Sequence, residues 1–138
     1  MKSASRFAVA ALASAVSLAA VAQGPKQREA ERLALFQRHA SPPQRSIHYF
    51  RTEGFEYLGK DAQGQDVLAL WTDVNHVYLL ALESPCINLQ YANGIALTST
   101  SGNVSSRSDF VKYDRDRRCR IETIQKVDYR ALKSDKQG

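Results

Sequence analysis

Apolar and polar residues divide the chain into an apolar leader, one amphipathic segment and a series of β-type segments. Residues 7–20 form an uncharged run made mostly of alanine, valine, leucine and serine. Residues 23–40 predict a helix, because Ala30, Leu33, Phe36 and Ala40 recur at three- and four-residue intervals. The helix should end before Pro42 and Pro43, since proline lacks the amide hydrogen that a helix interior needs.

From residue 47 onward the pattern is that of β-strands. Two near-continuous apolar runs, residues 67–71 and 77–82, flank a turn at residues 73–76 and predict a central, buried hairpin. Residues 100–106 have the composition of a polar loop, and residues 129–138 that of a loose polar tail. Further strands are predicted at residues 47–50, 55–58, 95–99, 110–113 and 118–128, with one helical turn at residues 89–92.

The last predicted strand alternates between two faces with one irregularity. Cys119, Ile121, Thr123 and Val127 share a face, whereas Ile124 falls among the polar residues of the other face. Together these segments predict a mainly β fold: a small antiparallel barrel or curved sheet with an N-terminal α-helix. Closure or curvature of the sheet limits its exposed edges.

The first residues have the three parts of a secretory signal peptide. Lys2 and Arg6 precede the apolar run, which ends in the small-residue tripeptide 20–22. A membrane anchor would need roughly 20 predominantly apolar residues, and this run is shorter. We therefore predict four parts: a signal peptide over residues 1–22, the helix and Pro-Pro linker over 23–43, a β domain over 44–128 and the tail over 129–138. The resulting protein would be periplasmic or secreted, with no membrane span after removal of the signal.

Charge adds little about function. The formal net charge is +5 and the pI about 9.4, and the leader holds two of these positive charges. The remaining basic residues are scattered along the chain, so nucleic acid is not an expected partner. If there is an electrostatic partner, an anionic envelope surface fits better than nucleic acid, but a merely solvated basic surface is favoured over either.

The two cysteines, Cys86 and Cys119, both follow the leader. In an oxidising compartment an even count of two predicts one structural disulfide. A redox-active pair would normally be separated by two residues, and zinc would need further ligands at short spacing. The sequence predicts no cofactor.

The sequence contains no recognisable motif for metal binding or for hydrolysis. His39, His48 and His76 fall in different predicted elements, and residues 61–66 lack most of the carboxylates of a calcium loop, so no metal site is expected. No Gly-x-Ser-x-Gly elbow is present. Three residues remain as candidate binding residues: Asp109, an acid in a Ser-rich loop that could instead cap that loop, and Trp71 and Tyr78, aromatics that could instead fill the core.

The second half of the chain resembles a known family. The succession Tyr78-Leu79-Leu80, Pro85-Cys86, Asp109-Phe110-Val111 and Arg118-Cys119-Arg120-Ile121 is similar to that of small exported proteobacterial proteins classed as a domain of unknown function. The resemblance covers roughly residues 71–128 and implies periplasmic placement and a Cys86–Cys119 bond. It implies no activity or catalytic residue.

The sequence therefore favours a periplasmic binding or interaction module without catalytic activity. Its partner would be an envelope protein or a small ligand. The alternative is a small cell-envelope hydrolase that uses Asp109 with a second carboxylate.

Overall fold

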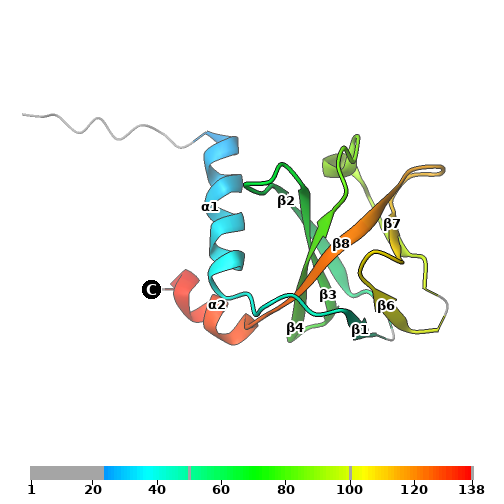
Figure 1. The fold of residues 1–138 in the computed structure, drawn as a ribbon. Helices are drawn as coiled ribbons and strands as arrows, with labels where there is room; N and C mark the ends of the chain where they lie inside the picture. Colours follow the sequence, from blue (N-terminus) through cyan, green and yellow to red (C-terminus); the bar gives the residue numbers. More distant parts are fainter. Residues whose placement is uncertain (1–23, 50, 100, 138) are drawn as a thin grey trace, which may run out of the picture.

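The computed structural model describes residues 24–137, apart from residues 50 and 100 (Figure 1). The predicted signal peptide lies outside the described residues. In the described part of the chain, two α-helices and eight strands follow one another in the order α1 Pro25–Arg38, β1 Ser46–His48, β2 Gly54–Lys60, β3 Asp66–Asp73, β4 His76–Leu82, the 3-10 turn η1 Leu89–Tyr91, β5 Ala96–Leu97, β6 Asn103–Ser105, β7 Phe110–Lys112, β8 Arg118–Val127 and α2 Tyr129–Gln137.

Six strands form one curled antiparallel sheet. Their order across the sheet is β2-β3-β4-β8-β7-β5, and β1 pairs with β6 in a separate two-stranded sheet. The sheet curls into a half-barrel, and α1 and α2 lie beside it (Figure 1). The predicted fold class, a mainly β curved sheet with an N-terminal helix, is confirmed.

The central hairpin β3–β4 is buried on both faces of the sheet. Leu68 pairs with Leu80 and Ala69 with Leu79, so neighbouring pairs face opposite sides. Leu68 and Leu80 belong to a cluster shared with β1, β6 and η1, whereas Ala69 and Leu79 belong to a cluster beneath the helices. Strands buried on both faces need near-continuous apolar sequence, which is the pattern that predicted this hairpin.

Both helices cover the same face of the sheet. Leu33 and Phe36 of α1 and Leu132 of α2 are buried among side chains of β3 and β4. The prediction of a loose tail over residues 129–138 is therefore wrong for residues 129–137, which form α2. Asp128 caps α2 by accepting a hydrogen bond from the Ala131 amide at 3.0 Å, and Leu132 is only 2% exposed. In the described part of the chain, no helix combines the length and apolar character needed to cross a membrane.

A β-bulge explains the irregular pattern of β8. Leu80 pairs with Ile124 and Leu82 with Ile121, so β8 has one more residue than β4 between these pairs. The extra residue shifts the alternation by one position. Ile121 and Ile124 consequently lie in the same hydrophobic cluster, and the prediction that Ile124 faces the polar side is wrong.

The Pro-Pro linker and the predicted 100–106 loop both contribute strand-like pairing. Ser41 donates its amide to the Lys126 carbonyl at 2.7 Å and Gln44 to the Ile124 carbonyl at 2.8 Å, so the linker runs along β8. Residues 103–105 form β6, which pairs with β1 and so corrects the expectation of a loop. Their polar composition conceals this pairing, because only Val104 is fully buried.

Gly59 allows helix α1 to approach β2. It lies beside a bulge in β2 with a φ of +94°, and a Cβ atom there would lie 3.0 Å from Cδ of Glu29 on α1. Gly64 in the β2–β3 turn also has a positive φ, +77°, but a Cβ atom there would have no neighbour within 4 Å. Substitutions at the two positions therefore distinguish the cost of backbone strain from the cost of disturbing the contact with α1.

We expect Gly64→Ala to lower the free energy of unfolding by about 1 kcal/mol, through backbone strain alone. Gly59→Ala should cost about 2 kcal/mol, because Glu29 must also move. Urea unfolding followed by the fluorescence of Trp71, the one tryptophan in the sequence, measures both variants. Equal losses would show that the contact between α1 and β2 adds nothing.

Candidate binding site

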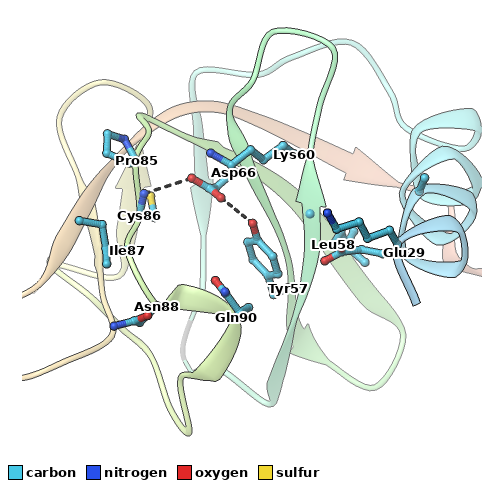
Figure 2. Close-up of a pocket in the computed structure, with 13 residues that line it drawn as sticks. Glu29, Tyr57, Leu58, Lys60, Asp66, Pro85, Cys86, Ile87, Asn88 and Gln90 are labelled. Carbon is cyan, nitrogen blue, oxygen red and sulfur yellow. Dashed lines mark hydrogen bonds between the residues drawn. The ribbon is translucent and has the colours of Figure 1, made fainter. Parts of the chain in front are cut away.

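A cavity of about 720 Å³ lies between the N-terminal half of α1, strand β2 and the segment that follows β4 (Figure 2). Lys26, Glu29 and Ala30 of α1 form one wall. The opposite wall comes from residues 85–90. Between them lie the β2 residues Tyr57, Leu58, Gly59 and Lys60, with Asp66 of β3.

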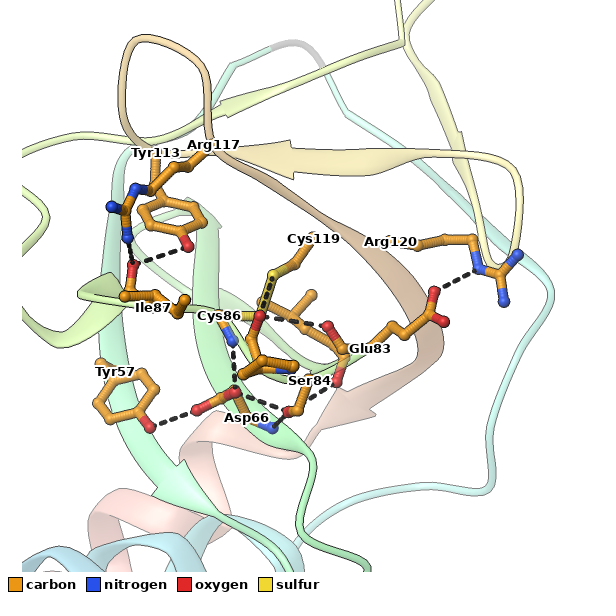
Figure 3. Close-up of a disulfide and its surroundings, with 12 residues drawn as sticks. Tyr57, Asp66, Glu83, Ser84, Cys86, Ile87, Tyr113, Arg117, Cys119 and Arg120 are labelled. Carbon is orange, nitrogen blue, oxygen red and sulfur yellow. Dashed lines mark hydrogen bonds and ion pairs between the residues drawn. A yellow bond between two sulfur atoms is a disulfide. The ribbon is translucent and has the colours of Figure 1, made fainter.

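Asp66 is the buried polar residue of this site. It is 2% exposed and pairs with Leu82, so the chain beyond β4 passes close to its carboxylate. Tyr57 donates its hydroxyl to Oδ1 at 2.6 Å, and Oδ2 accepts from the Ser84 hydroxyl at 2.6 Å and the Cys86 amide at 3.1 Å (Figure 3). One carboxylate thereby joins β2, β3 and the segment after β4.

These contacts determine the charge state of Asp66. Burial alone would raise the pKa of its carboxyl group. The hydrogen bonds from Ser84, Tyr57 and Cys86, together with the positive charge of Lys60, outweigh burial and hold the pKa below its ordinary value. Burial, and the hydrogen bond to Asp66, raise the pKa of Tyr57 far above its ordinary range. At neutral pH the pair is therefore a carboxylate accepting from a neutral phenol.

The predicted disulfide is present and anchors one wall of the cavity. Cys86 is bonded to Cys119 near the start of β8, with 6.0 Å between the two Cα atoms (Figure 3). The Ile87 carbonyl also accepts hydrogen bonds from the Tyr113 hydroxyl at 2.9 Å and from Nη1 of Arg117 at 3.1 Å. The wall is thus held by covalent and polar contacts on the side away from the cavity.

A smaller cavity of about 360 Å³ continues along the same helix. It shares Lys26, Glu29, Tyr57 and Leu58 with the larger one. At its far side Arg32 of α1 forms an ion pair with Glu56 of β2, with Nη2 2.8 Å from Oε2. The two cavities form one groove between α1 and β2, closed by this ion pair.

The groove is amphipathic. Its apolar lining includes Pro85 and Ile87 above the buried Leu58, and the side chain of Ile87 is among the few large apolar ones left exposed in the described residues. Its polar groups are amides and charges of both signs: Asn88, Gln90, Lys26, Lys60 and Glu29. Across residues 24–137, except 50 and 100, no group of three or more potential metal ligands occurs. The arrangement can hold an apolar group while hydrogen-bonding a polar one.

Asp109 lies in the loop before β7 and is not among the residues lining this groove. Its Oδ1 accepts from the Thr98 hydroxyl at 3.0 Å and its Oδ2 from the Ser105 amide at 2.7 Å. Both carboxylate oxygens therefore accept hydrogen bonds from nearby residues of the same chain, as in a residue that caps a loop.

Trp71 and Tyr78 are half-buried and lie on opposite faces of the sheet. The Trp71 ring stands edge-on to Phe36 and Tyr129, with ring centroids 5.9 Å and 6.2 Å apart. Tyr78 packs against the cluster of the other face. The structure thus brings none of the three predicted binding residues together, and none of them lines the groove.

Asp66 is a site residue that was not among the predicted binding residues. It follows the turn segment 61–65, in which Asp61 shapes the turn by accepting the amides of Gln63 at 3.0 Å and Gln65 at 2.9 Å. The signal for Asp66 was an acid directly before a run of apolar residues. Such an acid begins a buried strand and therefore needs hydrogen-bond donors.

The fold and the groove define a small β domain with one disulfide and a groove beneath its N-terminal helix. No curated protein and no solved structure matches the chain significantly. A protein-family model described as a family of unknown function, DUF6491, matches residues 3–137. The chain therefore belongs to this family, in agreement with the resemblance to proteins of unknown function.

Proposed function

We propose that this protein is an exported binding module that holds its ligand in the groove between α1, β2 and residues 85–90. The observation that carries the proposal is the cavity of about 720 Å³. Its walls come from separate parts of the chain: the Asp66 hydrogen bonds join β2 to the segment after β4, and the disulfide ties that segment to β8. A preformed concave site with apolar surface and a few polar groups is the usual form of a ligand site.

Binding accounts for this site better than catalysis does. Both oxygens of Asp66 accept hydrogen bonds, and burial together with the hydrogen bond to Asp66 keeps the Tyr57 phenol protonated. Groups held in this way suit a fixed framework rather than proton transfer. The alternative of paired-carboxylate hydrolysis draws no support from Asp109, whose oxygens are engaged by Thr98 and Ser105.

Two observations support periplasmic or secreted placement. The first is the leader pattern of residues 1–22. The second is the Cys86–Cys119 disulfide, a bond that persists in oxidising compartments. The ligand we propose is a small amphipathic molecule or a short segment of an envelope protein, since the groove offers both apolar and polar surface.

Native mass spectrometry of the protein, purified gently from the extracytoplasmic fraction, tests the proposal. We expect a chain that starts at Gln23, lacks two hydrogens because of the disulfide and carries a bound ligand. Ile87→Ser should lower the occupancy at least about fivefold, because it removes apolar contact area within the groove. Val74→Ser is the matched control: Val74 is 73% exposed and Ile87 56%, but Val74 lies at the β3–β4 turn, away from the groove.

Each part of the proposal can fail separately. A retained leader or two free thiols would contradict export. A protein that is bare in every preparation would contradict ligand binding, and equal losses in the Ile87→Ser and Val74→Ser variants would place the ligand elsewhere.

A further inference from the structure

A second cavity, of about 590 Å³, lies at the far end of α1 from the groove. It is bounded by the β3–β4 turn, the end of β8 and the first turns of α2, and it shares no lining residue with the groove. Three of its residues are cationic: Lys126 of β8 and Arg130 and Lys133 of α2. Ser41, Asn75 and His76 add polar groups to the lining.

The positive charges of this cavity are largely uncompensated. Within the described part of the chain, Lys126, Arg130 and Lys133 form no ion pair; the Lys133 ammonium instead lies 4.7 Å from the centre of the Tyr129 ring. Asp128 is the one acid in the lining; its carboxylate offsets one of the three positive charges, and the lining keeps a net positive charge. The His76 imidazole lies 2.6 Å from the Asp73 carboxylate, outside the lining.

The turn from β8 into α2 places these charges, which are close together in the sequence, around one cavity. The basic residues come from the end of β8 and from α2, which docks through Leu132. Elsewhere on the chain, basic residues such as Arg32, Arg38 and Arg120 are paired with carboxylates. Three unpaired cations around one hollow raise its local potential and attract anions.

We propose that this cavity binds a phosphate-type anion. Such an anion carries several oxygens, which can accept hydrogen bonds from lysine and arginine together with serine, asparagine or histidine donors. The required chemistry is present either in free inorganic phosphate or in the phosphate of an anionic lipid headgroup. This inference does not depend on the groove or on its ligand.

The first arm of the test uses inorganic phosphate. Titration into the 15N-labelled protein starting at Gln23, at low ionic strength, should shift amide signals around residues 126–133 and leave the groove unchanged. The double variant R130Q/K133Q should weaken phosphate binding at least about fivefold, since it removes two of the three cations that would form charge-assisted hydrogen bonds with the anion. K126Q, on β8 rather than α2, should weaken binding without affecting the helix. The matched control is K136Q, which removes a charge from the same helix outside the cavity.

The second arm uses vesicles of phosphatidylglycerol and of phosphatidylcholine. Co-sedimentation with the anionic vesicles alone, lost in R130Q/K133Q and kept in K136Q, would identify a lipid headgroup as the source of the phosphate. Binding of free phosphate without co-sedimentation would identify a soluble anion. Absence of binding in both arms, or equal losses in K136Q and R130Q/K133Q, would overturn the proposal.

Discussion

Removal of the disulfide in a C86A/C119A variant is expected to lower the free energy of unfolding by about 3–4 kcal/mol. The two cysteines are separated by 33 positions, and the cross-link restricts the unfolded chain over that length. In the chain-entropy account, this restriction is the main source of the stabilisation. A typical domain has only about 5–15 kcal/mol of stability in total, so the variant should be close to unfolded at elevated temperature.

Urea unfolding followed by Trp71 fluorescence checks this prediction. The wild-type protein treated with a thiol reductant is the matched control, and its midpoint should coincide with that of the variant. The dependence of the free energy of unfolding on urea concentration should also become steeper, because an unfolded chain without the cross-link exposes more surface. A loss below about 1 kcal/mol would mean that the unfolded chain is already compact across residues 86–119.

The second large effect is expected at Asp66. Asp66→Asn should lower the free energy of unfolding at neutral pH by about 2–3 kcal/mol. The substitution replaces one carboxylate oxygen with an amide nitrogen in a group that accepts from Tyr57, Ser84 and the Cys86 amide. At least one buried donor would then face another donor. Asp116→Asn, at an exposed loop position, is the matched control and should change stability by less than about 0.5 kcal/mol.

The loss at Asp66 should depend on pH in a defined direction. Its hydrogen bonds and Lys60 hold the pKa of the folded state below the ordinary value of about 4, despite burial. The ionised carboxylate therefore stabilises the folded protein above pH about 4, and this contribution is lost as the pH falls through the lowered pKa. The difference between wild type and Asp66→Asn should accordingly be largest near pH 7 and shrink below pH about 4. A difference that grows on acidification would mean that Asp66 is protonated in the folded protein.

Much of the fold was determined by local sequence. The helix at α1 followed from apolar spacing and flanking prolines, and the β3–β4 hairpin from two apolar runs of strand length. These features can be predicted because a buried surface imposes a pattern of apolar residues on the chain. The pattern has a period of 3.6 residues in a helix and is continuous where both faces of a strand are covered. The Cys86–Cys119 bond was predictable because only two cysteines exist.

Helix α2, and the face of the sheet that each residue of β8 occupies, could not be predicted in the same way. Among the described side chains of α2, Leu132 alone is buried, which is too little to reveal a period. In β8 the bulge inserts one residue and reverses the alternation, so Ile121 and Ile124 point to the same side although an odd number of positions separates them. Both features depend on what the partner elements cover.

The candidate site shows the same division most clearly. The sequence alone determined the fold class, the single disulfide and the position of the buried hairpin, since each follows from local periodicity or a unique pairing. The meeting of Tyr57, Ser84 and Cys86 on Asp66 depends on how the strands and loops pack, as does the placement of Lys126, Arg130 and Lys133 around one cavity. The Asp66 site joins segments that are separated along the chain, and strand register determines that they meet. The three cations lie close together in the sequence, and they surround a cavity because α2 docks beside the end of β8.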